Sequence, residues 1–219
     1  VSADVRDVDG RPVVWVDVDA TEKQGALSSV SSSQIEAAAV LARTKGFPLV
    51  AIVRSSGADI AEGLAALHGW GLAARAIADC SGVVPVIMVV DGPAVSGPAL
   101  LSGLADLVVM TSRSYAFVSG PTMVAEFTGV MIDNEELGGA SSHARYTGAA
   151  SLVAPDLEVA TEMVGQLLSY LPAHNDEEPP RFPTDDPIDR ETPEAGSVIP
   201  ASSTGSYDVV WWIAVALGV

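Results

Sequence analysis

Short apolar runs alternate along the chain with longer segments of helical periodicity. Leu49–Val53 is an uninterrupted apolar run, as expected of a strand buried on both faces of a sheet, and Val84–Val90 is a second strand-like run. Helices are predicted over about 33–45, 60–78 and 156–170, where apolar residues recur every three or four positions. Strands that alternate with helices imply right-handed crossovers, so the predicted fold class is α/β, with a mostly parallel sheet, βα repeats and flanking helices.

Local signals add two details at the beginning of the chain. Asp9-Gly10 is a two-residue turn before the β-rich run Val13–Val18, which predicts an N-terminal hairpin. Ser33 and Glu36 have the spacing of a capping box, so the first helix is expected to begin near Ser33.

The composition changes near the end of the chain. From Asn175 to Ser206 it is rich in Pro, Asp, Glu, Ser and Thr and has no periodicity, and an apolar run follows. We therefore expect a folded domain over 1–175, an acidic connector over 176–206 and an apolar segment over 207–219. That last segment is expected to face a partner, although packing onto the chain's own core is the alternative.

Charge and cysteine content exclude several classes of protein. The chain has 11 Lys and Arg against 28 Asp and Glu, a net charge of −17, and nucleic acids and anionic membranes require a basic face. Cys80 is the single cysteine, which excludes an internal disulfide and a four-cysteine zinc site, and no metal is expected. No export signal is recognisable and Val209–Val219 is too short to span a bilayer, so a cytoplasmic protein is expected.

Two loops of small residues follow the two buried strands. The first contains Ser55-Ser56-Gly57-Ala58, and the second runs from Asp91 to Gly97. Small residues after a strand allow backbone amides to approach a ligand closely. Taken alone, such glycines are more typical of ordinary tight turns.

Several further motifs, in order and at matching spacing, extend over nearly the whole chain. The sequence resembles the carboxyltransferase β chains of propionyl-CoA and acetyl-CoA carboxylases, a biotin-dependent family. The matching segments are Asp9-Gly10-Arg11-Pro12, Gly46-Phe47-Pro48, Gly92-Pro93, Ser119-Gly120-Pro121, Glu135-Glu136-Leu137-Gly138-Gly139-Ala140, Leu167-Leu168-Ser169-Tyr170-Leu171-Pro172 and Tyr207-Asp208. The resemblance implies a crotonase-like (ClpP/crotonase) fold, and it covers only the first of the family's two such domains, the one that binds acyl-CoA.

The resemblance also implies which residues form the site. In this chemistry the protein supplies mainly backbone N–H donors to a developing oxyanion, each worth roughly 3 kcal/mol. The implied catalytic donors are the amides of Gly57, Ala58, Ser96 and Gly97. The implied acyl-CoA-binding residues are Arg54, Ser56, Gly92, Pro93, Gly120 and Pro121.

The chain departs from the family pattern at both loops. Ser56 and Ser96 each replace the first glycine of a pair, which removes easy access to positive φ. Arg54 and Asp59 occupy positions where the family has the opposite charges, so we expect these two side chains to form a salt bridge. Basic residues near the CoA are also replaced, at Ser31–Gln34 and at Ala125.

The function that the resemblance implies is transfer of a carboxyl group from carboxybiotin to the α-carbon of an acyl-CoA. The expected partners are a second, biotin-binding carboxyltransferase domain or subunit and a biotinylated carrier protein, within an oligomer. An acyl-CoA decarboxylase subunit and a non-catalytic assembly subunit are the alternatives. A crotonase-type hydratase or isomerase is disfavoured because Pro98–Gly103 contains no carboxylate.

Overall fold

The computed structural model describes residues 1–187 and 189–217. The chain divides into two compact units, Val1–Pro180 and Arg181–Val219. The first unit contains the sheet and both loops, and the described residues of the second form two short helices. The functional division into an acyl-CoA-binding domain, a connector and a partner-facing segment stays a prediction.

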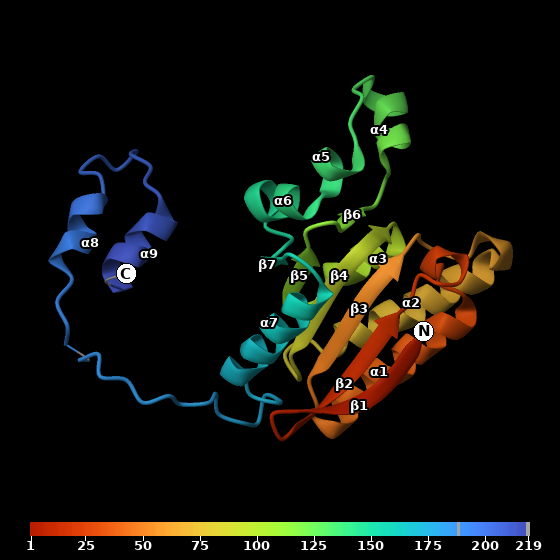
Figure 1. Cartoon of the computed structure of the whole chain (residues 1–219), viewed down its shortest axis with the longest axis horizontal. Helices are drawn as coiled ribbons and strands as arrows, with labels where there is room; N and C mark the ends of the chain where they lie inside the picture. Colours follow the sequence, from red (N-terminus) through yellow and green to blue (C-terminus); the bar gives the residue numbers. More distant parts are fainter. Residues whose placement is uncertain (188, 218–219) are drawn as a thin grey trace. The chain divides into compact units, whose positions relative to one another are not determined.

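One sheet organises the first unit (Figure 1). Among the described residues it has seven strands in the order β1-β2-β3-β4-β5-β7, and β6 pairs with β4. β1 and β2 form the predicted antiparallel hairpin and the other pairs are parallel, as expected for βα repeats. The strands are β1 (Ser2–Val8), β2 (Arg11–Val18), β3 (Leu49–Ser55), β4 (Val86–Val95), β5 (Leu107–Thr111), β6 (Tyr115–Phe117) and β7 (Leu152–Ala154).

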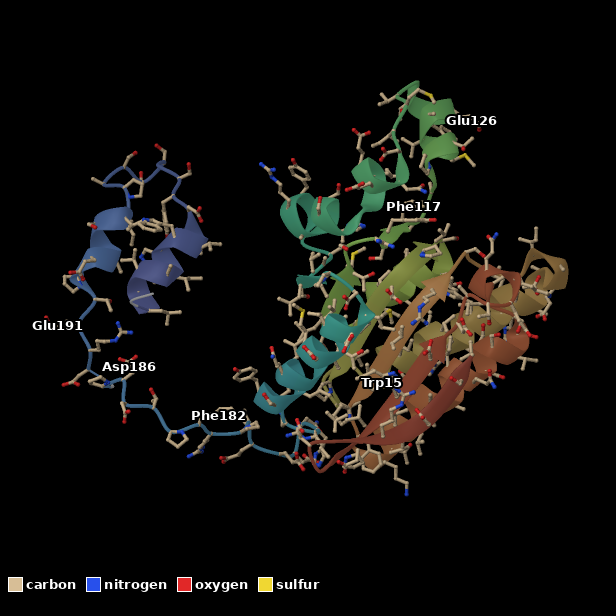
Figure 2. The ribbon with its side chains drawn as sticks, viewed as in Figure 1. Trp15, Phe117, Glu126, Phe182, Asp186 and Glu191 are labelled. Carbon is tan, nitrogen blue, oxygen red and sulfur yellow. The ribbon has the colours of Figure 1, made fainter. Side chains whose placement is uncertain are left out.

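Helices cover both faces of this sheet. α1 and α2 pack on one face and α7 on the other, so two apolar cores form, and Trp15 of β2 (labelled in Figure 2) lies in the α7 core. The helical elements are η1 (Lys23–Gly25), α1 (Ser29–Lys45), η2 (Ile60–Glu62), α2 (Leu64–Ala78), α3 (Gly97–Ser102), α4 (Pro121–Thr128), α5 (Asn134–Gly138), α6 (Ala140–Ser142), η3 (His143–Thr147), α7 (Leu157–Tyr170), α8 (Pro193–Val198) and α9 (Val209–Leu217). The three predicted helices correspond to α1, to η2 with α2, and to α7.

The predicted start of the first helix is wrong. α1 begins at Ser29, and the cap is Ser28, whose side chain accepts a hydrogen bond from the Ser31 amide. Ser33 lies inside the helix and its hydroxyl donates to the Val30 carbonyl. Several serines precede the apolar positions, and the one with an extended backbone becomes the cap.

The predicted end of the second buried strand is also wrong, because β4 continues from Val90 to Val95. Ala94 pairs with Ser55 of β3 on one side and with Ala116 of β6 on the other. Two neighbours therefore hold a stretch of small residues extended, and local sequence patterns do not register such tertiary pairing.

The second unit contains helices α8 and α9, which pack against each other. Large apolar side chains of α9 are exposed, including Val210 at 76% and Trp211 at 60%. None of the described helices combines the length and the apolar content needed to cross a bilayer.

Candidate functional site

The two predicted loops lie side by side at the carboxyl ends of β3 and β4. Ser55 and Ala94 are paired after a register shift that begins at Val53. A side chain added at Gly57 would begin 3.5 Å from the Val95 carbonyl oxygen and 3.9 Å from Ser96 Cβ. Strand pairing thus brings together residues that lie about 40 positions apart in the sequence.

The four amides implied by the resemblance, those of Gly57, Ala58, Ser96 and Gly97, differ in their hydrogen-bond acceptors. The Ser96 amide donates to the Phe117 carbonyl at 2.8 Å, so its proton is already used within the fold. The Gly57 amide makes a long bond of 3.3 Å to Ser55 Oγ. Within the described part of the chain, the amides of Ala58 and Gly97 have no acceptor. These two remain as donors for a ligand, one on each loop.

Ser96 keeps a backbone conformation that normally requires glycine. Its φ is 61° and its ψ is −116°, whereas Ser56, the other serine in place of a glycine, does not have a positive φ. A side chain in such a region costs on the order of 1 to 3 kcal/mol and persists only where its surroundings enforce it. The second loop therefore keeps its turn despite the serine.

Gly97 is required by a neighbouring tryptophan. A Cβ at this position would lie 2.7 Å from Nε1 of Trp70, which comes from α2. That indole nitrogen is buried and, in the described residues, has no hydrogen-bond partner. Contact with Trp70 thus limits how closely the second loop can approach α2. The sequence gave no signal for this contact.

The turn in η1 is strained and contacts the first loop. Lys23, Gln24 and Gly25 in η1 all have positive φ. Ser55 Oγ donates to the Gly25 carbonyl at 2.6 Å, and a Cβ at Gly25 would lie 2.0 Å from the Arg54 carbonyl oxygen. The backbone of this turn touches the end of β3, a second contact that the sequence did not indicate.

The predicted salt bridge between Arg54 and Asp59 is wrong. Arg54 Nε donates to Asp91 Oδ2 and Arg54 Nη1 to Asp17 Oδ1, both at 2.8 Å, while Asp59 pairs with Lys23. Side chains alternate along a strand, so Arg54 lies on the same face as Ile52, the α7 face, together with Asp17 and Asp91. Asp59 lies beyond the loop, where Lys23 of η1 reaches it.

Both cations near the first loop are already neutralised. Burial disfavours the charged form of Arg54, but the hydrogen bonds and charges of Asp91 and Asp17 outweigh it and raise the pKa of the guanidinium. The hydrogen bond between Lys23 and Asp59 raises the pKa of the amine and lowers that of the carboxyl. Little positive charge is therefore left for CoA phosphates at this loop.

The remaining predicted binding residues fall into two places. Gly92 and Pro93 belong to β4. A Cβ added to Gly92 would lie 3.8 Å from Arg54 Cγ. Gly120 caps α4 and Pro121 begins that helix. Phe117 (labelled in Figure 2) lies between Gly120 and the second loop: a Cβ added to Gly120 would lie 3.4 Å from its ring, and its carbonyl accepts a hydrogen bond from the Ser96 amide.

Two other reactive side chains have structural roles. His143 is bonded at Nε2 to the Ala116 carbonyl at 2.7 Å and at Nδ1 to Thr147 Oγ1 at 2.8 Å. Cys80 is buried, and burial raises the pKa of its thiol to about 11, so it remains a neutral packing group. No described group of three or more His, Cys, Asp or Glu side chains could hold a metal ion.

Comparison with known families identifies the fold and its lineage. The carboxyl transferase domain family matches residues 1–217. The chain belongs to this family. The resemblance drawn from the sequence motifs is thereby confirmed.

Individual members of the carboxyl transferase domain family are moderately similar to the chain. The propionyl-CoA carboxylase carboxyltransferase subunit of Haloferax mediterranei is 35% identical over 205 residues, which are 93% of this chain and 40% of that protein. The methylmalonyl-CoA carboxyltransferase 12S subunit of Propionibacterium freudenreichii subsp. shermanii is 32% identical, over 91% of this chain and 38% of that protein. The chain thus spans about two fifths of the length of these relatives.

Solved structures of the family confirm the crotonase-like fold. The transcarboxylase 12S crystal structure with hydrolysed methylmalonyl-coenzyme A bound has a TM-score of 0.83 and 31% identity. The match covers 97% of this chain and 42% of the transcarboxylase chain.

The charge cluster at the ends of the strands yields a first prediction. Arg54→Ala should lower the free energy of unfolding by about 2 kcal/mol, because two charge-assisted hydrogen bonds are lost from partly buried groups. Urea unfolding of Arg54→Ala, Asp91→Ala and the double variant should show a combined loss smaller than the sum. Arg113→Ala, at an exposed position, is the control and should change stability by less than about 0.5 kcal/mol.

A second cycle, with Asp59→Ala in place of Asp91→Ala, distinguishes the observed pairing of Arg54 with Asp91 from the predicted pairing with Asp59. Losses from Arg54→Ala and Asp59→Ala should add, because these residues do not interact. Coupling between Arg54 and Asp59, with none between Arg54 and Asp91, would contradict the structure.

The strained serine yields a second prediction. Ser96→Gly should raise the free energy of unfolding by about 1 kcal/mol, because glycine adopts positive φ without steric cost. Ser56→Gly is the matched control and should lower it by about 0.5 to 1 kcal/mol, because there glycine only adds freedom to the unfolded chain. Denaturant midpoints measure both effects, and a Ser96→Gly variant that loses as much as Ser56→Gly would show that the turn is unstrained.

Proposed function

We propose that this chain is the acyl-CoA-binding part of a biotin-dependent carboxyltransferase. The observation that carries the proposal is the pair of amides at Ala58 and Gly97, which lie on adjacent loops and have no acceptor in the described part of a carboxyl transferase domain. Two N–H donors on adjacent loops suit a carbonyl oxygen that gains negative charge during a reaction.

The proposed mechanism begins with the thioester of the substrate. Its carbonyl oxygen accepts hydrogen bonds from the Ala58 and Gly97 amides. The proton of the α-carbon would pass to the biotin held by the partner once that biotin has given up its carboxyl group, and the negative charge of the enolate would develop on the thioester oxygen. There each preorganised donor contributes roughly 3 kcal/mol. Backbone donors fixed by Trp70 and by the η1 turn need no rearrangement as this charge appears.

The remaining parts of the reaction are assigned to partners. Biotin on a carrier protein would supply the carboxyl group, and a second carboxyltransferase domain or subunit would bind that biotin. Lys23 and Arg54 are each paired with carboxylates, which supports a partner as the source of positive charge for the CoA phosphates.

Binding of CoA esters is the third prediction and tests the proposal. Calorimetry on the assembled protein should detect binding of propionyl-CoA. Gly97→Ala should weaken this binding about tenfold, because the added methyl group displaces the loop from Trp70 and one hydrogen bond is lost. Gly71→Ala, on α2 with no atom near the added methyl group, is the control and should bind normally.

Failure of this experiment has a defined meaning. If no acyl-CoA binds the assembled protein at millimolar concentration, the carboxyltransferase proposal falls and the non-catalytic assembly subunit replaces it. If Gly97→Ala binds as tightly as the original protein, the amide pair is not the thioester site.

The apolar segment 207–219 supplies the fourth prediction, which concerns assembly. Exposed large side chains on α9 are unfavourable in water, each by on the order of 1.5 to 3 kcal/mol, so we propose that a partner subunit covers them. Deletion of 207–219 should dissociate the complex in sedimentation experiments, while circular dichroism shows that the first unit stays folded.

Two outcomes would reject the partner-facing role. A truncated chain that keeps its full assembly would show that the segment is not at an interface. A truncated chain that unfolds would show instead that the segment packs on its own core. Trp211→Ser is the milder variant, and it should weaken assembly without the loss of a whole helix.

A further inference from the structure

A cavity of about 460 Å³ lies on the α1 and α2 side of the sheet, beside α3. Its floor comes from β4, β5 and β6, and its outer wall from α5, η3 and their connections. The apolar side chains that define it are Val90, Val108, Met110, Phe117, Val118 and Leu137.

The polar side chains in the cavity wall make hydrogen bonds within the protein, although Asp106 and Ser151 are exposed. His143 uses both ring nitrogens on Ala116 and Thr147. Ser102 donates to the Pro98 carbonyl, and Ser151 accepts from the Val108 amide. Asp106 accepts from the Val86 amide at 2.8 Å. Because these groups are engaged, the interior favours an apolar occupant over a polar one.

The volume indicates how large that occupant can be. An apolar cavity of about 150 Å³ is sufficient to hold benzene, which has six carbons. The cavity beside α3 is about three times larger. It therefore has room for a hydrocarbon chain well beyond the length of a propionyl group.

The position of the cavity connects it to the second loop. Ala99 lines the cavity and lies in the first turn of α3, two residues after Gly97. Phe117 contributes its side chain to the cavity while its carbonyl binds the Ser96 amide. The elements that hold the proposed thioester site thus also form one wall of the cavity.

We propose that this cavity receives the hydrocarbon chain of a medium-length acyl-CoA, longer than propionyl-CoA. The inference rests on the proposed function, since α3 begins at Gly97, a residue of the proposed thioester site, and contributes Ala99 to the cavity lining. It deepens that function by naming the substrate class.

Chain length is the first test. Octanoyl-CoA and propionyl-CoA are compared by calorimetry on the assembled protein. Each buried methylene strengthens binding by up to about fourfold, so octanoyl-CoA should bind at least about tenfold more tightly than propionyl-CoA.

Cavity-filling variants are the second test. Ala105→Leu and Ala149→Leu each place a larger side chain in the cavity lining, and neither residue belongs to the thioester site. Each should weaken octanoyl-CoA binding about tenfold and leave propionyl-CoA binding unchanged. Ala78→Leu, at an exposed position near the end of α2, is the matched control and should change neither.

The outcomes separate this inference from the proposed function. Equal binding of the two esters, or an octanoyl preference that both filling variants preserve, would overturn the cavity assignment and leave the carboxyltransferase proposal intact. Absence of binding to either ester would overturn both. Circular dichroism of each variant establishes that a loss of binding is not a loss of fold.

Discussion

The candidate site depends on the parallel pairing of β3 with β4 as far as Ser55 and Ala94. Neither loop could form the site alone, because each supplies one backbone amide that has no acceptor in the described chain. The pairing sets the distance between those amides with the rigidity of a sheet. A register slip of one residue would turn side chains to the opposite face and separate the donors.

Steric contacts then fix the two loops on this frame. Trp70 leaves no space for a side chain at Gly97, and the Arg54 carbonyl leaves none at Gly25. On the other face of the sheet, Arg54 links β2, β3 and β4 through Asp17 and Asp91. The strain at Ser96 is compatible with this arrangement because the surrounding contacts define the turn more strongly than the residue does.

Local pattern was sufficient to predict the βα order, the hairpin and the first loop, because buried strands and amphipathic helices have recognisable sequence patterns. It did not predict that β4 takes up most of the second loop. It could not predict that Arg54 faces Asp17 and Asp91, since this depends on which strands become neighbours. The family resemblance implied four donors where the structure leaves two without an acceptor, because the acceptor of the Ser96 amide, the Phe117 carbonyl, lies on a strand whose pairing is tertiary. Trp70 and the η1 turn were missed for the same reason: their role is contact with backbone, which no motif records.

The central claim is that the two loops together bind a thioester oxygen through the amides of Ala58 and Gly97. A crystal structure of the assembled protein with a non-hydrolysable acyl-CoA analogue tests this claim most directly. The account predicts that the oxygen standing for the thioester carbonyl lies about 2.7 to 3.2 Å from both amide nitrogens. An analogue bound with that oxygen away from both amides, or on the opposite edge of the sheet, would contradict it.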